Sequence, residues 1–332
     1  MCATVSPQRR GHRNTRCIRS AAKPKGQSLK KRRQDIHGWL VLDKPLGMTS
    51  TQAVGKVRWL FDANKAGHGG TLDPLATGIL PIALGEATKT VSYAMDGKKT
   101  YRFTVAWGEE RTTDDPEGSV TKLSNEKPSR VRIESLLSEF TGEIQQIPPA
   151  FSAIKVEGER AYDLARAGAA PDLAPRLVFI EELKLIDQPD PAHAIFEVTC
   201  GKGTYVRSLA RDMGRKLGCF GHVSALRRIR LGPFTEADAI PLERLEEMRH
   251  KPPGGNAMDG FLRPIATVLD GIPALALDEA QAQRLRLGQS VLLRGAKAPI
   301  ASDAVLVTLG QKPIGICSIE QGSLKPKRLF NL

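Results

Sequence analysis

The pattern of apolar and polar residues predicts several short strands. Trp39–Leu42 is a short apolar run of strand type, and Ile79–Leu84 is a continuous apolar run typical of a buried strand. A third segment alternates between apolar and polar residues, which predicts a half-buried strand. Its apolar members are Tyr101, Phe103, Val105 and Trp107. Further strands are predicted at 178–186 and 194–199.

Two segments have the periodicity of helices. Thr49 or Ser50 can cap a helix that continues to about Phe61, and its inner face would carry Val54, Val57 and Leu60. Residues 204–217 form a second predicted helix, with Val206, Ala210, Met213 and Leu217 turned inward. The strands and helices do not alternate as regular βαβ units, so the pattern indicates an α+β fold.

The last quarter of the chain has a different pattern. Residues 250–256 are rich in proline and glycine and are typical of a linker. A predicted helix at 278–287 then precedes short apolar runs at 291–293, 305–309 and 314–318, which indicates a small β-rich domain. The predicted boundaries are 1–36 for a tail, 37–248 for the main domain, 249–271 for the linker and 272–332 for the β-rich domain.

The positive charge is unevenly distributed along the chain. The formal net charge is +13, but residues 1–34 contain eleven Lys or Arg and no acid, so the other 298 residues carry only +2. The main domain therefore needs a local basic patch to attract a polyanion. The densest candidate is residues 202–230, with Lys202, Arg207, Arg211, Arg215, Lys216, Arg227, Arg228 and Arg230. For Arg211 and Arg215, a solvated helix face is an equally good interpretation.

The basic tail has little apolar surface to bury and is predicted to be disordered. Three interpretations of it stay open: an RNA-binding arm, an Arg-rich targeting peptide, and a start codon placed upstream of the true one.

The cysteine and histidine content disfavours other classes of protein. The five cysteines form no Cys-x-x-Cys pair, and the six histidines lack a ligand spacing such as His-x-x-x-His. Neither a metal site nor a disulfide framework is expected. No apolar run approaches the length that spans a bilayer. The expectation is a cytoplasmic, nucleic-acid-binding protein.

The most informative segment is 67–80, Gly-His-Gly-Gly-Thr-Leu-Asp-Pro-Leu-Ala-Thr-Gly-Ile-Leu. Its carboxylate, Asp73, follows glycines that allow tight turns or close backbone approach to a ligand, and it precedes Pro74. For Asp-Pro alone, an ordinary turn is the simpler interpretation. The full segment resembles the catalytic loop of the bacterial tRNA pseudouridine-55 synthases, the TruB family, in which this aspartate attacks the target uridine.

The resemblance continues along the chain in the order of the family. The matching blocks lie at 39–50, 84–89, 99–102, 148–162 and 202–207. Leu324–Leu332 is similar to the end of the PUA-type RNA-binding domain that many members carry. The resemblance implies a pseudouridine-synthase fold, which is a mixed, largely antiparallel sheet flanked by helices, followed by a small PUA-like domain.

The resemblance also implies three catalytic residues. Asp73 would be the nucleophile, and Arg207 would hold it ionised and aimed through a forked, two-pronged contact, although a simple phosphate contact is the alternative for Arg207. Tyr101 would stack on the target uracil with its hydroxyl near the atom that loses or gains a proton. A core tyrosine on a strand would look the same in the sequence.

Four further residues are expected to bind the substrate. Lys44 would support the wall of the active site, with a surface role as the alternative. Leu226 would line the uracil pocket, although any buried leucine would look the same in the sequence. His68 would contact the flipped-out nucleotides. Tyr205 belongs to the block that carries Arg207.

One turn departs from the family pattern. Members commonly show Thr-Asp-Thr after the strand of Tyr101, whereas this chain has Arg111-Thr112-Thr113 followed by Asp114 and Asp115. Asp115 occupies the position of a family acid near the active-site arginine, and the role of the turn stays open.

The activity that the resemblance implies is isomerisation of uridine 55 in the T-loop of tRNA, after the base is extruded from the folded loop. The reaction breaks the N1–C1′ bond and rejoins the uracil through C5 without redox change, so no cofactor is expected. Whether Asp73 attacks C1′ or C6, or first removes a sugar proton, stays open. The expected substrate is the T-arm stem-loop, recognised by a monomer without an obligatory protein or guide-RNA partner. The alternatives are a guide-RNA-dependent synthase and a tRNA-folding chaperone whose catalysis is incidental.

Overall fold

The computed structural model describes residues 33–152, 154–156, 158–161, 164, 173–249, 259–293 and 299–332. The predictions for residues 1–32 and for the linker at 250–256 lie outside these ranges. Within them, no helix is long and apolar enough to cross a membrane.

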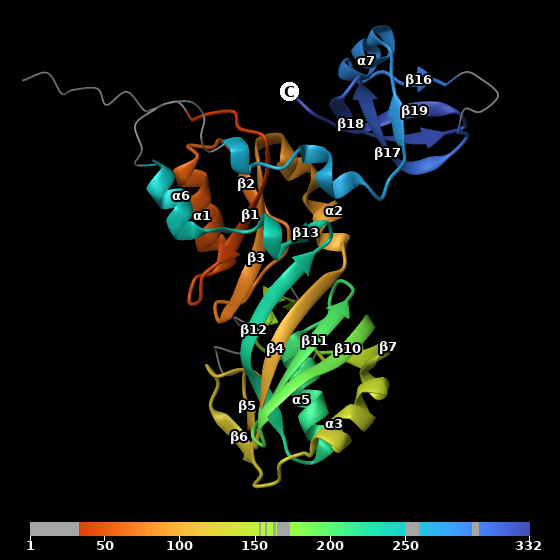
Figure 1. Ribbon diagram of the computed structural model, residues 1–332. Helices are drawn as coiled ribbons and strands as arrows, with labels where there is room; N and C mark the ends of the chain where they lie inside the picture. The colour runs from red at the N-terminus through yellow and green to blue at the C-terminus, as the bar shows by residue number, and fades with distance from the viewer. Residues whose placement is uncertain are drawn as a thin grey trace, which may run out of the picture. The chain divides into compact units, whose positions relative to one another are not determined.

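Ten strands of the described residues form one mixed sheet (Figure 1). Its order is β14-β1-β3-β12-β4-β11-β10-β7, with β2 paired to β3 and β13 paired to β12. The bounds are β1 Gly38–Lys44, β2 Ala66–His68, β3 Ala76–Leu84, β4 Lys99–Trp107, β7 Gly142–Gln146, β10 Arg176–Asp190, β11 His193–Cys200, β12 Gly221–Leu231, β13 Phe234–Thr235 and β14 Ile240–Pro241. All five strands predicted for the main domain are confirmed, and the sheet with its helices confirms the α+β class.

Strand β12 connects the two halves of this sheet. It runs parallel to β3, where Leu226 lies opposite Ala76 and Arg228 opposite Gly78, and antiparallel to β4 on its other side. The pairing with β4 shifts register between Val223 and Ala225 and again between Arg228 and Arg230. Such irregularities bend a strand and re-aim its side chains. The segment that pairs with the start of β3 therefore lies between two bends.

The helices begin where their capping residues predict. Helix α1 (Ser50–Leu60) has Thr49 as N-cap, and the side chains of Thr49 and Gln52 form a reciprocal capping box. Helix α5 (Val206–Leu217) starts two residues later than predicted because Tyr205 has extended backbone angles, and it ends at Gly218 with φ +72°. The shorter helices are α2 Val91–Asp96, α3 Arg130–Leu136 and α6 Leu242–Arg249, with the 3₁₀ turns η1 Gly85–Thr90, η2 Leu137–Phe140 and η3 Glu236–Asp238.

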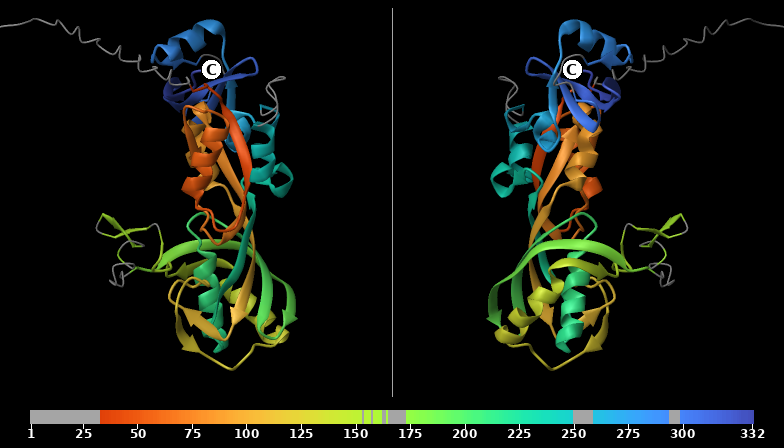
Figure 2. Two further views of the ribbon diagram at one scale, coloured as in Figure 1. Left: turned by 90° about the vertical axis from the view of Figure 1, so that its left-hand side faces the viewer. Right: turned by 90° about the vertical axis from the view of Figure 1, so that its right-hand side faces the viewer.

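Both faces of β1 and β3 are buried, which explains their continuous apolar sequences. Leu40 and Leu42 pack on α1, whereas Trp39 and Val41 pack on the opposite side of the sheet. A second core lies between α3, α5 and the strands β4, β10, β11 and β12, and Figure 2 shows α5 on the inner side of the curved strands. Tyr101 and Leu226 contact this core and also the core between the sheet and α1. The junction of these two cores therefore lies at the centre of the sheet.

Two small hairpins accompany this sheet. Strands β5 (Glu109–Arg111) and β6 (Val120–Leu123) enclose the turn that departs from the family pattern, and β8 (Lys155–Val156) pairs with β9 (Glu159–Arg160).

The β-rich C-terminal domain is present as predicted. Its sheet has the order β15-β17-β18-β19-β16, and α7 (Glu279–Arg286) is capped by Asp278. The bounds are β15 Ala274–Ala276, β16 Val291–Leu292, β17 Ser302–Leu309, β18 Lys312–Glu320 and β19 Ser323–Leu329. Residues 259–271, which we expected to belong to a linker, include the 3₁₀ turns η4 (Asp259–Phe261) and η5 (Ile265–Leu269). They pack on the main domain, because Arg263 exchanges two backbone hydrogen bonds with Trp39.

Gly78 is required by the close approach of β3 to β12. Its φ is +95°, and an added Cβ would overlap the carbonyl oxygen of Arg228 and lie 2.9 Å from the Arg228 nitrogen. We expect Gly78→Ala to lower the free energy of unfolding by about 2–4 kcal/mol, from backbone strain and steric overlap. Gly55→Ala, in the exposed part of α1 with open space around it, should instead raise it by about 0.5–1 kcal/mol. Urea unfolding of both variants checks the pair, and equal effects would contradict it.

Candidate active site

Asp73 lies on the loop between β2 and β3, immediately before the paired part of β3. The Ala76 nitrogen donates to the Asp73 carbonyl at 3.0 Å, which closes a tight turn around Pro74. The Asp73 side chain is 39% exposed. The carboxylate is therefore accessible, although the backbone that carries it is fixed.

Arg207 contacts this carboxylate from the first turn of α5. Its Nε lies 3.0 Å from Asp73 Oδ2, and its side chain is only 7% exposed. The structure thus confirms the predicted pair between residues that are far apart in the sequence. A buried guanidinium beside an exposed carboxylate makes a charge-assisted contact that fixes the direction of the carboxylate.

The expectation of a two-pronged hold on Asp73 is wrong. Only Nε reaches Asp73, because the other two nitrogens of Arg207 donate to the carbonyl oxygens of Thr113 at 2.9 Å and Phe151 at 3.0 Å. Asp115 Oδ2 lies 3.6 Å from Arg207 Nη1. The guanidinium is consequently held by several segments at once and presents one donor to Asp73.

The turn at 111–118 holds the arginines of α5. Its Thr113 carbonyl and Asp115 carboxylate face Arg207, and Asp114 Oδ2 lies 3.0 Å from Arg211 Nη1. Asp114 has a positive φ of 59°. Burial raises the pKa of Asp114 to about 6, and the neighbouring Arg211 opposes that rise. The departure from the family sequence thus leaves this turn in contact with the arginine that pairs with Asp73.

Lys44 is fully buried below the loop, which excludes the surface alternative. Its Nζ donates to the carbonyl oxygens of Met48 at 2.7 Å, Pro45 at 2.9 Å and Pro74 at 3.3 Å. Burial lowers the pKa of Lys44 to about 8, while the nearby Asp73 carboxylate raises it and Arg228 lowers it further. Lys44 therefore fixes the residue after Asp73 and supplies positive charge from the interior.

Tyr101 occupies the junction of the two cores on β4. Burial raises the pKa of its hydroxyl, so the group is a neutral phenol at physiological pH. Tyr101 lies opposite Arg228 in the pairing of β4 with β12, and the charge of that guanidinium opposes the rise in pKa. Contact of its ring with a substrate stays a prediction.

A small cleft is lined by Asp73, Arg207, Asp115 and Leu226, together with Leu75, Ala76, Pro116 and residues 223–225. The structure thus brings the predicted nucleophile, its arginine and the predicted pocket leucine to one place. Lys44, Tyr101, His68 and Tyr205 are not among the residues that line this cleft.

His68 and Tyr205 lie on elements next to the site. His68 is on β2, where its buried Nδ1 has no hydrogen-bond partner among the described residues, and burial together with Arg228 lowers its pKa. Tyr205 precedes α5, and Gln146 exchanges two hydrogen bonds with its backbone, at 2.8 and 3.0 Å. Burial raises the pKa of the Tyr205 hydroxyl. Their roles in binding stay predictions.

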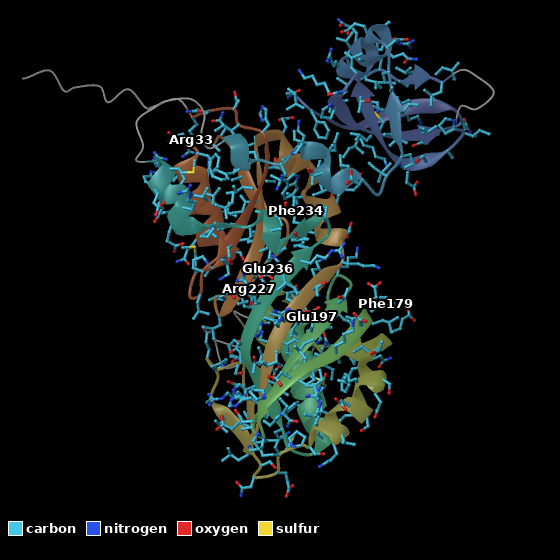
Figure 3. All side chains as sticks on the ribbon, viewed as in Figure 1. Arg33, Phe179, Glu197, Arg227, Phe234 and Glu236 are labelled. Carbon is cyan, nitrogen blue, oxygen red and sulfur yellow. The ribbon has the colours of Figure 1, made fainter. Side chains whose placement is uncertain are left out.

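The segment 202–230 is not a free basic patch, which corrects our expectation. Six of its eight basic side chains are paired with carboxylates from elsewhere in the chain or within α5, and Figure 3 shows one such pair, Arg227 with Glu236. Arg228 is buried, and Arg230 donates to the Gly232 carbonyl. Arg211 is buried too, so a solvated face does not describe it. The segment has an excess of basic residues in the sequence because most of the carboxylates that pair with them come from distant parts of the chain.

Sequence reasoning missed two residues that hold the Asp73 loop. Ser50 was taken only as a helix cap, yet its Oγ is buried and bonded to the backbone of Leu72. Arg228 was assigned only to the basic patch of 202–230. Residues two apart in a strand share a face, so the prediction that Leu226 faces the site also places Arg228 on that face of β12.

The comparisons with known proteins agree with this geometry. A family model described as "TruB family pseudouridylate synthase (N terminal domain)" matches residues 58–206. Two further models, "tRNA pseudouridylate synthase B C-terminal domain" and "Pseudouridine synthase II TruB, C-terminal", match residues 207–270 and 273–330.

Curated relatives match nearly the whole chain. A protein from Bradyrhizobium diazoefficiens named tRNA pseudouridine synthase B is 57% identical over 313 residues, covering 94% of this chain and 91% of its own. A protein of the same name from Brucella anthropi is 54% identical, covering 91% of this chain and 98% of its own.

Solved structures share the fold at low sequence identity. The Nop10-Cbf5 complex of the archaeal box H/ACA sRNP gives a TM-score of 0.67 at 22% identity, covering 88% of this chain and 85% of that one. A Cbf5-Nop10-Gar1 complex gives 0.67 at 24% identity, covering 88% and 84%. The fold and the family models together define the class as pseudouridine synthases. The chain belongs to the TruB family.

The pKa of Lys44 generates a prediction for alkaline pH. Above pH 8 a neutral Lys44 amine has two N–H donors for three carbonyls and no charge, so the reaction rate at saturating RNA should fall. We expect Lys44→Met to be slower at pH 7 and to show no inflection near pH 8. Single-turnover rates from pH 6.5 to 9.5 check this.

Unfolding cannot account for such a loss. Between pH 8 and 10.5 the folded protein has released the Lys44 proton while the unfolded chain retains it, so this group makes the fold more stable as pH rises. An inflection near pH 8 that persists in Lys44→Met would assign it to another group.

Proposed function

We propose that this protein converts uridine 55 in the T-loop of tRNA to pseudouridine, with Asp73 as the nucleophile. The observation that carries the proposal is the 3.0 Å contact between the Arg207 guanidinium and the exposed Asp73 carboxylate, in a cleft that also contains Leu226. Membership of the TruB family and relatives named tRNA pseudouridine synthase B support tRNA as the substrate.

The lining of the cleft suits a flipped-out base. Its apolar residues Leu75, Ala76, Val223 and Leu226 would exclude water from a uracil taken out of its stack. Asp73 is the one carboxylate of the cleft that stands at its exposed side, since the Asp115 side chain is only 10% exposed. Arg207 keeps Asp73 aimed before attack, and the Tyr101 phenol lies within the junction where the base would stack.

Recognition would be local. Most basic side chains of the segment 202–230 are already paired, so the folded T-loop must be recognised by shape, stacking and base extrusion more than by a large charged surface. A compact T-arm hairpin then suffices as substrate, and no protein or guide RNA is needed. The solved Cbf5 and H/ACA RNP structures support the fold alone, because their identity to this chain is 22–24%.

The nucleophile is tested by Asp73→Asn. We expect pseudouridine formation to fall by more than about 1000-fold, while tRNA affinity stays within a few fold, because the amide is nearly isosteric and lacks only the nucleophilic charge. Asp96→Asn, an exposed carboxylate paired with Lys202, is the matched control and should retain normal rates. Pseudouridine mapping in an unmodified tRNA transcript measures the effect, and near-normal turnover of Asp73→Asn would refute its role.

The substrate is tested with the isolated T-arm stem-loop and pure protein. We expect tritium release from 5-tritiated uridine at position 55 of the hairpin at a rate within about tenfold of that from full tRNA, with no guide RNA present. The same hairpin with cytidine at that position is the control. Release from full tRNA without release from the hairpin would show that recognition extends beyond the T-arm.

A further inference from the structure

Arg228 is a fully buried cation with no carboxylate within ion-pair distance among the described residues. It is 1% exposed. Its Nε donates to the Ile79 carbonyl at 2.9 Å, and its two terminal nitrogens donate to the Gly70 carbonyl at 3.1 Å and the Thr71 carbonyl at 3.3 Å. A buried charge is costly unless polar groups compensate it. Here three backbone carbonyls do so.

The three carbonyls lie on both sides of Asp73. Gly70 and Thr71 precede Asp73 in the loop, and Ile79 follows it in β3. Gly70 has a φ of +148°, a backbone conformation that L side chains rarely adopt, so the segment that presents this carbonyl to Arg228 favours glycine. One guanidinium therefore ties the entry of the loop to the strand that leaves it.

Arg228 also lies beside the second residue expected to act on the base. It is opposite Tyr101 in the register of β12 with β4, and its charge lowers the pKa of the Tyr101 hydroxyl against the effect of burial. The same charge contributes to lowering the pKa of Lys44 and of His68. Its influence thus extends over the residues that surround the Asp73 loop.

Ser50, the first residue of α1, also holds the Asp73 loop. Its Oγ donates to the Leu72 carbonyl at 2.9 Å and accepts from the Leu72 nitrogen at 2.8 Å. With Lys44 on the Pro74 carbonyl, the backbone on either side of Asp73 is bound by buried side chains.

We infer that Arg228, assisted by Ser50, is the positioning residue of this active site. It fixes the backbone that carries Asp73 relative to the Tyr101 hydroxyl, so that nucleophile and aromatic platform keep one geometry when the base enters. Arg228 itself touches no reacting atom. This inference rests on the proposed function, because it specifies how the same site is preorganised for attack.

Arg228→Lys is the direct test, since an ammonium keeps the charge but cannot reproduce the planar guanidinium that spans three carbonyls. Displacement of a reacting group by about 1 Å can cost on the order of 100-fold in rate. We expect the single-turnover rate on unmodified tRNA to fall by about that factor, with tRNA affinity within threefold of wild type. Ser50→Ala should lose about tenfold in rate, again with affinity retained.

Arg58→Lys is the matched control. Arg58 also donates to loop carbonyls, those of Ala63 and Asn64, but does not line the cleft. Its rate should stay within twofold. A folded Arg228→Lys variant with a rate within threefold of wild type would overturn the inference, as would a loss of affinity that equals the loss of rate.

Hydrogen exchange of the peptide covering residues 69–76 provides a readout that does not depend on activity. It should speed up in Arg228→Lys and in Ser50→Ala, but not in Arg58→Lys. If Arg228→Lys does not fold, Ser50→Ala decides, and unchanged rate and exchange in that variant would refute the inference. If the wild-type protein does not modify tRNA, the proposed function fails, whereas exchange still decides whether these residues hold the loop.

Discussion

The site depends on the hydrogen bonding of β12 to β3 on one side and to β4 on the other. Strand β3 carries the Asp73 loop at its start, and β4 carries Tyr101. Strand β12 directly follows α5 in the chain, and the first turn of α5 presents Arg207 to Asp73. Without this central strand, Asp73, Tyr101 and Arg207 would belong to separate halves of the sheet with separate cores. The position of the cleft at the junction of those cores follows from this pairing.

Most basic side chains of the segment 202–230 are paired with nearby carboxylates. Acidic side chains from distant segments neutralise most of the basic residues of 202–230, while the uncompensated or partly compensated cations, Arg228 and Lys44, are buried beneath the loop. Two buried cations thus lie beside the Asp73 loop. Their charges act on the loop with less screening than those of exposed side chains.

Rigidity of the loop has an identifiable origin. Gly70 adopts a φ of +148° where its carbonyl accepts from Arg228, and Gly78 in the following strand admits the β12 backbone. Side chains from β1, α1 and β12 then bind the carbonyls on both sides of Asp73. The sequence predicts that Gly67, Gly69 and Gly70 allow a tight turn or the close approach of a ligand. The loop instead combines an accessible carboxylate with a backbone that is almost wholly committed to internal hydrogen bonds.

The sequence by itself determined the local elements and the identity of the central acid. The apolar run at Trp39, the alternation from Tyr101 to Trp107 and the cap at Thr49 are short-range signals, and each predicted its element because strand and helix periods act over a few residues. The motif around Asp73 with the later Arg207 identified the family and the pair. Only the tertiary structure decided how Arg207 divides its donors, which acids neutralise Arg211 and Arg227, and that Arg228 and Ser50 hold the loop. Those outcomes depend on contacts between residues up to about 185 positions apart, such as Arg227 with Asp43, and on burial, which no local pattern encodes.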